Sequence, residues 1–153
     1  MKINALQTSV KLLSKKAYST SKLKASLKKK LFPDDEIEDA ISKLQQKNYI
    51  NDQRYTEDRV ICLIRKNYGD IYIYSKLETE ELSISESELM SLRQEYKLEE
   101  NFVLKQVIED KMRQLKSEDI DRKLPKIIRY LVSRGFSPDK VTSELGVDDV
   151  SWN

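Results

Sequence analysis

The chain has 153 residues, which fits one compact domain or a few small helical modules, and it is 39% hydrophobic and 35% charged with a net charge of +2. It has no histidine, only three glycines and a single cysteine, which excludes Ser-His-Asp and Cys-His catalysis, histidine-bound zinc, glycine-rich phosphate loops and an internal disulfide. No apolar window approaches the roughly 18 residues of a membrane span and no signal peptide opens the sequence, so we expect a cytoplasmic protein that is not an enzyme and has no cofactor, metal site or membrane contact.

Apolar residues recur at helical spacing along almost the whole chain, and abundant Lys, Glu and Leu with few Gly and Pro favour helices. The spacing predicts about nine helices and no sheet. In chain order, the apolar stripes are Leu6, Val10 and Leu13; Leu23, Leu27 and Leu31; Ile37, Ile41 and Leu44; Val60, Leu63 and Ile64; Ile73 and Leu77; Leu89, Leu92 and Tyr96; Leu104, Ile108, Met112 and Leu115; Leu124, Ile127, Ile128 and Leu131; and Val141 and Leu145.

The charges are unevenly distributed along the chain. Residues 1–50 carry eleven Lys and Arg against five Asp and Glu, whereas residues 51–100 carry seven against twelve. Residues 1–31 hold nine lysines and no acid. Such a segment is either an ordinary solvated lysine face or a positive field that attracts phosphate backbones or an acidic protein. Both interpretations stay open at this point.

Three segments share a leucine followed five positions later by an apolar residue, after which a helix begins. They are LKKKLFPDDEI from Leu27, LETEELSISES from Leu77 and LVSRGFSPDKV from Leu131. A helical repeat of about fifty residues predicts tandem modules that each contact mainly their neighbours. The predicted fold is therefore all-α, with three tandem three-helix units that form an elongated, curved body. We expect these units at residues 1–52 (basic), 53–98 (acidic) and 99–153.

The third of these corners contains one of the few glycines. Gly135 is predicted to lie just past a helix end in a left-handed conformation, with Phe136 in the core and Ser137 capping the next helix. Leu31 and Glu81 stand where Gly135 does in the other two corners. We therefore expect those two corners to turn by a different geometry.

Three stretches of the sequence resemble a known family. LLSKKAYSTSKLKASLKKK, LQQKNYINDQRYTEDRVICLIRKNYG and LVSRGFS are similar, in this order and spacing, to the RecX family of bacterial regulatory proteins, which modulate the RecA recombinase. The likeness spans roughly residues 8–145. Family members usually carry Gly-Ile where this chain has Glu81 and Leu82, so the geometry of the middle corner is in question.

The resemblance implies a protein that binds the RecA–DNA filament in its helical groove and mostly inhibits ATP hydrolysis and strand exchange. It would act as a monomer in DNA repair, recombination and the SOS response, with single- or double-stranded DNA as a second candidate partner. Two alternatives remain from the residues themselves: a helical protein that binds DNA directly through its basic N-terminal unit, and a helical scaffold for another protein.

Basic residues are the candidates for filament or nucleic-acid binding, and each is weighed against an ordinary solvated or structural role. The structural alternative for the arginines near Asp52 is an ion pair, because Asp52 is expected to cap the fourth helix and to pair with an arginine. The candidate contacts are Lys15, Lys16, Lys28, Lys29 and Lys30 in the acid-free segment; Arg59 and Arg65; and Arg122, Lys126 and Arg129 on one helical face, with Arg134 one turn further on.

Overall fold

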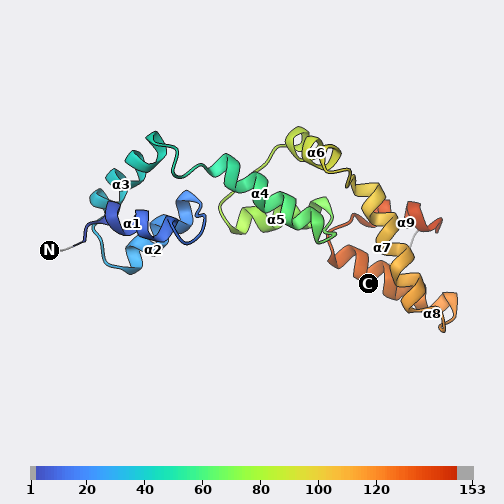
Figure 1. Ribbon diagram of the computed structural model, residues 1–153. Helices are drawn as coiled ribbons and strands as arrows, with labels where there is room; N and C mark the ends of the chain where they lie inside the picture. Colours follow the sequence, from blue (N-terminus) through green and yellow to red (C-terminus); the bar gives the residue numbers. More distant parts are fainter. Residues whose placement is uncertain (1–2, 148–153) are drawn as a thin grey trace. The chain divides into compact units, whose positions relative to one another are not determined.

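The computed structural model describes residues 3–147, in which helices are joined by short corners (Figure 1). Nine α-helices and no strand lie in this range, which confirms the predicted all-α fold. Trp152, which we expect to lie at a frayed end or in a local hydrophobic contact, is outside the described residues. The helices are α1 (Ala5–Leu13), α2 (Thr20–Lys29), α3 (Asp34–Gln46), α4 (Asp52–Arg65), α5 (Asp70–Thr79), α6 (Glu86–Glu95), α7 (Glu100–Gln114), α8 (Ile120–Ser133) and α9 (Pro138–Leu145).

The helices are grouped into two compact units, each described here by itself. Unit 1 comprises the residues up to Asp58 together with Glu80–Leu82, and unit 2 comprises Arg59–Thr79 together with the residues from Ser83 onward. The chain therefore passes between the units three times. The division into three sequence repeats at residues 1–52, 53–98 and 99–153 stays a prediction.

Unit 1 has its core where α1, α2 and α3 pack against one another (Figure 1). Two of the predicted core positions are wrong: Val10 is 50% exposed and Leu31 is 89% exposed. The buried face of α1 runs through Ala5 and Ser9, which leaves Val10 on the solvent side, and Leu31 follows the end of α2. The buried core residues of unit 1 are Ala5, Leu23, Leu27, Ile37, Ala40, Ile41, Leu44 and Ile50.

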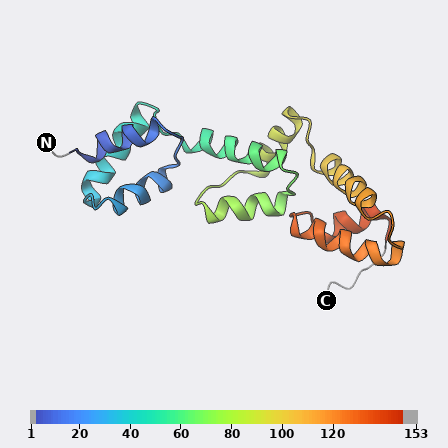
Figure 2. The ribbon, with the colours of Figure 1, turned by 60° about the horizontal axis from the view of Figure 1, so that its bottom comes forward.

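Unit 2 has a second core between α7, α8 and α9, which lie side by side in both ribbon views (Figures 1 and 2). Phe136 is fully buried in it, as predicted. Ser137 caps α9 by accepting a hydrogen bond from the backbone N–H of Lys140, also as predicted. The buried residues of this core are Val103, Leu104, Val107, Ile127, Ile128, Leu131, Phe136 and Val141.

The start of α4 differs from the prediction for Asp52. The side chain of Asn51 accepts a hydrogen bond from the N–H of Arg54 and so occupies the capping position. Asp52 is the first residue of the helix, and its carboxylate instead accepts from the N–H of Thr20, at 2.8 Å, at the start of α2. The aspartate therefore stabilises the N-terminus of another helix of unit 1 and not its own.

Most helices end in the same way, with a left-handed residue directly after the cap. The following N–H then reaches back to a carbonyl five residues earlier, as from Phe32 to Leu27 (3.3 Å) and from Phe136 to Leu131 (3.2 Å). The expectation that the corners at Leu31 and Glu81 turn differently from Gly135 is therefore wrong. The residues with positive φ are Leu31, Asn48, Asn67, Glu81, Lys97, Gly135 and Gly146.

Two backbone corners of unit 2 meet at a pair of glycines. The N–H of Gly69 donates to the carbonyl of Arg134 (2.8 Å), and the N–H of Ile71 donates to the carbonyl of Gly135 (3.0 Å). A Cβ on Gly69 would lie 2.4 Å from the Gly135 oxygen, and one on Gly135 would lie 2.5 Å from the nitrogen of Tyr72. Both positions therefore need glycine for this close contact. At Gly135 the positive φ of 97° is a second reason, because glycine adopts it without strain.

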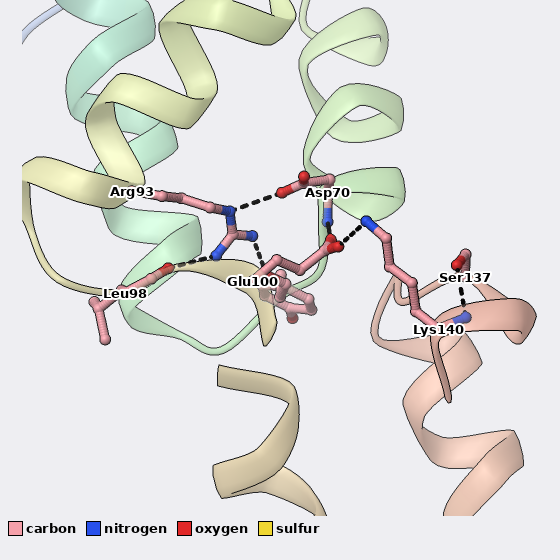
Figure 3. Close-up of polar contacts among 7 residues, drawn as sticks. Asp70, Arg93, Leu98, Glu100, Ser137 and Lys140 are labelled. Carbon is pink, nitrogen blue, oxygen red and sulfur yellow. Dashed lines mark hydrogen bonds and ion pairs between the residues drawn. The ribbon is translucent and has the colours of Figure 1, made fainter. Parts of the chain in front are cut away.

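A buried arginine joins further segments of unit 2 (Figure 3). Arg93 on α6 is 3% exposed, and its Nε donates to Oδ1 of Asp70 at 2.7 Å. Its two other nitrogens donate to the backbone carbonyls of Leu98 (2.8 Å) and Tyr68 (2.9 Å). Because each guanidinium nitrogen has an acceptor, the buried charge is both paired and hydrogen-bonded.

Glu100 extends this cluster from α6 to α7 and α9. Its Oε2 accepts from the N–H of Asp70 (2.6 Å) and its Oε1 accepts from Nζ of Lys140 (2.5 Å). Burial, together with the nearby Glu100 carboxylate, raises the pKa of Asp70 against the lowering effect of Arg93. The hydrogen bond from Lys140 to Glu100 raises the pKa of Lys140. We call Asp70, Arg93, Glu100 and Lys140 the buried polar cluster after its buried members, Arg93 and Glu100; Asp70 is half-buried and Lys140 is exposed.

The Gly135→Ala substitution should lower the free energy of unfolding by about 2–5 kcal/mol. The methyl group adds left-handed strain of about 1–2 kcal/mol and overpacking against Tyr72 of about 1–3 kcal/mol. Urea denaturation followed by circular dichroism measures the loss. Leu31→Gly is the matched control, because Leu31 has the same place after a helix, a positive φ and 89% exposure. It should cause no loss of stability, and a fully stable Gly135→Ala variant would contradict the contact.

The Arg93→Met substitution should cost about 3–5 kcal/mol, because it leaves Asp70 and two carbonyls without their buried donor. Arg113→Met is the matched control, since Arg113 is 76% exposed and pairs with Asp110 within one helix. This control should change stability by less than about 0.5 kcal/mol. Equal losses in the two variants, measured by chemical denaturation, would show that the cluster does not stabilise unit 2.

Candidate functional site

The five candidate lysines of the acid-free segment are exposed, but the structure divides them among different places on unit 1. Lys28 and Lys29 lie in the last turn of α2, where positive charge also complements the helix dipole. Lys28 lines a hollow that also contains the carboxylates of Asp52 and Glu81. Lys16 follows α1, and its Nζ lies 4.9 Å from the ring centroid of Tyr18. The five predicted lysines therefore do not form a single patch.

Lys15 and Lys30 come together at a pocket of about 390 Å³. The pocket extends along α1, from Ile3 before the helix to Lys15 after it, beside the chain that leaves α2, so residues distant in sequence share it. Three of its lining residues are lysines, three are apolar and none is acidic. We call it the lysine pocket, and it is lined by Ile3, Thr8, Lys11, Leu12, Lys15, Lys30 and Phe32.

Lys11 is a member of this pocket that the sequence analysis did not single out. It lies in the last turn of α1, and Lys15 follows four residues later. The helical spacing from Lys11 to Lys15 was a usable signal, because it places both on one side of the chain. The proximity of Lys30 had no such signal, since it depends on how α2 packs against α1.

The two candidate arginines of α4 differ in their surroundings. Arg65 is exposed, and its guanidinium carbon lies 5.1 Å from the ring centroid of Tyr96. Arg59 is half-buried; the pKa of Tyr72 is raised chiefly by its hydrogen bond with Tyr68, against the lowering effect of the Arg59 charge. The structure therefore does not bring the two arginines together as one cationic surface.

The candidates on α8 stay together only in part. Arg122, Lys126 and Arg129 are exposed and share a helix face by their spacing. Lys126 is paired with the carboxylate of Glu118 at 2.6 Å, which reduces its attraction for an external anion. This face therefore offers less positive charge than the sequence alone predicts.

Arg134 has a different environment from the rest of the α8 set. Its guanidinium donates to the backbone carbonyl of Lys66 and lies 3.8 Å from the ring centroid of Tyr68. Tyr68 stacks on Tyr72 with a centroid distance of 3.8 Å and nearly parallel planes. Because both partners lie so close to the Tyr68 ring, they occupy its opposite faces. Arg134 therefore packs within the corner that Gly69 and Gly135 form.

A second hollow, of about 310 Å³, lies beside the buried polar cluster in unit 2. Asp70, Arg93, Glu100 and Lys140 line it, and these groups are already paired with one another. Burial, followed by the neighbouring carboxylates of Asp70 and Glu86, raises the pKa of Tyr74. The four residues of the cluster therefore have a structural role in the packing of α5, α6, α7 and α9.

The described residues contain no group of three or more Cys, Asp or Glu side chains placed to hold a metal ion. No helix among them is long and apolar enough to cross a membrane. The lysine pocket is a place in unit 1 where lysines without an ion pair among the described residues and an accessible apolar lining coincide.

Comparison with known proteins agrees with the helical architecture and with the motifs. A family model described as the first three-helix domain of RecX matches residues 5–44, which cover α1, α2 and most of α3. A regulatory protein RecX from Pasteurella multocida is 31% identical over 144 residues, covering 93% of this chain and 86% of that protein. One from Haemophilus influenzae is 26% identical and covers 94% of both chains.

Solved structures show the same fold. The crystal structure of RecX from Lactobacillus salivarius has a TM-score of 0.74 at 21% identity, covering 93% of this chain and 92% of that one. A second crystal structure, of a regulatory protein RecX, has the same TM-score, and the match covers 93% of this chain and 70% of that one. With a relative that is 31% identical over nearly its whole length, the chain belongs to the RecX family of regulatory proteins.

Proposed function

We propose that this protein binds the filament that the RecA recombinase forms on DNA and lowers its ATPase and strand-exchange activity. It acts in the cytoplasm as a monomer, without catalysis of its own, in DNA repair and recombination. The observation that carries the proposal is the full-length similarity to proteins named regulatory protein RecX. The helical fold and the motifs around Tyr55 and Gly135 support it.

The charge distribution of unit 1 supports binding to an anionic surface. Nine lysines and no acid occupy residues 1–31, and the candidate lysines there are exposed. The same feature favours a second function, direct binding to DNA. The two are separable, because pure phosphate binding weakens by about one log unit per log unit of salt for each contacted phosphate, whereas a filament regulator needs RecA for tight binding.

An ATPase assay tests the proposal directly. The purified protein is titrated into RecA on single-stranded DNA, and the steady rate of ATP hydrolysis is measured. The rate should fall as the protein saturates the filament, while binding to the same DNA without RecA stays weak. An unchanged rate at several-fold excess over RecA contradicts filament regulation. Tight, salt-dependent binding to bare DNA would favour the second function.

Reversing the charge of Lys28, Lys29 and Lys30 together should weaken filament binding without unfolding the protein. All three are exposed, so each change should alter stability by less than about 0.5 kcal/mol. Replacement of attraction by repulsion lowers the association rate first and the affinity with it. Co-sedimentation with filaments and a thermal melt measure the two quantities.

The matched control reverses Lys47, Lys97 and Lys116, which are exposed lysines outside the acid-free segment and change the net charge equally. It should bind filaments nearly as the unmodified protein does. If the two triple variants bind alike, the lysines at the end of α2 have no special part in binding, and Arg122, Lys126 and Arg129 become the next candidates.

A further inference from the structure

We infer that the lysine pocket binds an acidic segment of a protein partner, with one apolar side chain of that segment inserted between the lysines. The pocket joins two features. Three apolar residues line it and leave room for a side chain, and three lysines line it as well. The chemistry of both features decides which occupant fits.

The charge of the pocket is not balanced from within. Lys11, Lys15 and Lys30 form no ion pair with a carboxylate among residues 3–147, and no acid lines the pocket. By contrast, the neighbouring Lys24 and Lys43 are paired with Glu38 and Asp39, each at 3.1 Å. The positive potential at the pocket is therefore available to an external anion.

The apolar lining is accessible as well. Ile3 is 60% exposed, while Leu12 and Phe32 are half-buried against the core of unit 1. Exposed apolar area in a concave site is removed from water when a side chain enters, at about 25 cal/mol per Å². A pocket of about 390 Å³ is in the range of sites that hold a compact group.

These properties favour an acidic peptide over a nucleic acid. A nucleic-acid groove follows the backbone with positive charge and offers open aromatic faces for stacking bases. The lysine pocket has one aromatic residue, Phe32, which is half-buried, and its only neutral hydrogen-bonding side chain is Thr8. An aliphatic or aromatic side chain flanked by carboxylates satisfies the apolar lining and the ammonium groups at once.

This inference deepens the proposed function and rests on it only for the identity of the partner, the protein component of the filament. The chemistry of the pocket can be tested without that component. The probe is a fluorescein-labelled peptide of aspartate and glutamate with one central leucine, measured by fluorescence anisotropy. A second peptide carries serine in place of leucine, and an unlabelled oligothymidylate of matched charge serves as competitor.

The leucine peptide should bind about tenfold or more tightly than the serine peptide, since the buried side chain contributes apolar area. The joint reversal K11E/K15E/K30E should weaken binding about tenfold or more. The matched reversal K47E/K97E/K116E, which changes the net charge equally at exposed lysines outside the pocket and outside the candidate contacts, should weaken it less than about threefold. Ile3→Ser should reduce the difference between the two peptides, which tests the apolar lining without a change of charge.

Equal weakening by the two triple variants would overturn the inference, because the peptide would then respond only to the net charge of the protein. Indifference to the central leucine, or stronger binding of the oligothymidylate, would overturn it too. The ATPase assay separates the two proposals. If the protein inhibits the ATPase but does not bind the peptide, the proposed function stands and the inference about the pocket fails. If it binds the peptide but does not inhibit the ATPase, the inference stands and the proposed function fails.

Discussion

Left-handed residues after the helices determine how the elements of each unit can pack. The helices have 8 to 15 residues and are joined by short corners, so each must stop and turn within a few positions. A positive φ lets two N–H groups return to carbonyls of the last turn and directs the next residue, such as Phe136 or Phe32, toward the helix. The packing of the helices in both cores therefore depends on these left-handed helix ends.

This constraint is met by different residue types, which explains both the success and the failure of the sequence analysis. Gly135 was predicted correctly because glycine adopts the left-handed conformation at little cost. Leu31 and Glu81 were not, because a side chain at positive φ costs about 1–2 kcal/mol and is normally avoided. The hydrogen bonds and apolar contacts of the corner offset this cost, and neither is visible in the one-letter code. Leu31 also had the spacing of a core residue, although it lies beyond the helix end.

The candidate site was predictable in its charge and not in its geometry. The lysine-rich, acid-free segment is apparent from counting, and it contains Lys15 and Lys30. Their meeting with Lys11 around an apolar pocket depends on the packing of α1 and α2, which one sequence does not specify. Arg93 had no signal at all, because an arginine within a charged helix resembles a surface residue. Its burial follows from the carbonyls and the carboxylate that other segments bring to it.

The short segment Glu80–Leu82 has a consequence for dissecting the protein. It belongs to unit 1, where Glu80 pairs with Lys22 and Glu81 accepts a hydrogen bond from Ser21, although the residues before and after it belong to unit 2. A gene fragment that ends at Asp58 would therefore encode unit 1 without this segment. One proteolytic cut between residues 59 and 79 would still leave the two pieces connected through contacts of unit 1. Neither unit corresponds to an uninterrupted length of chain.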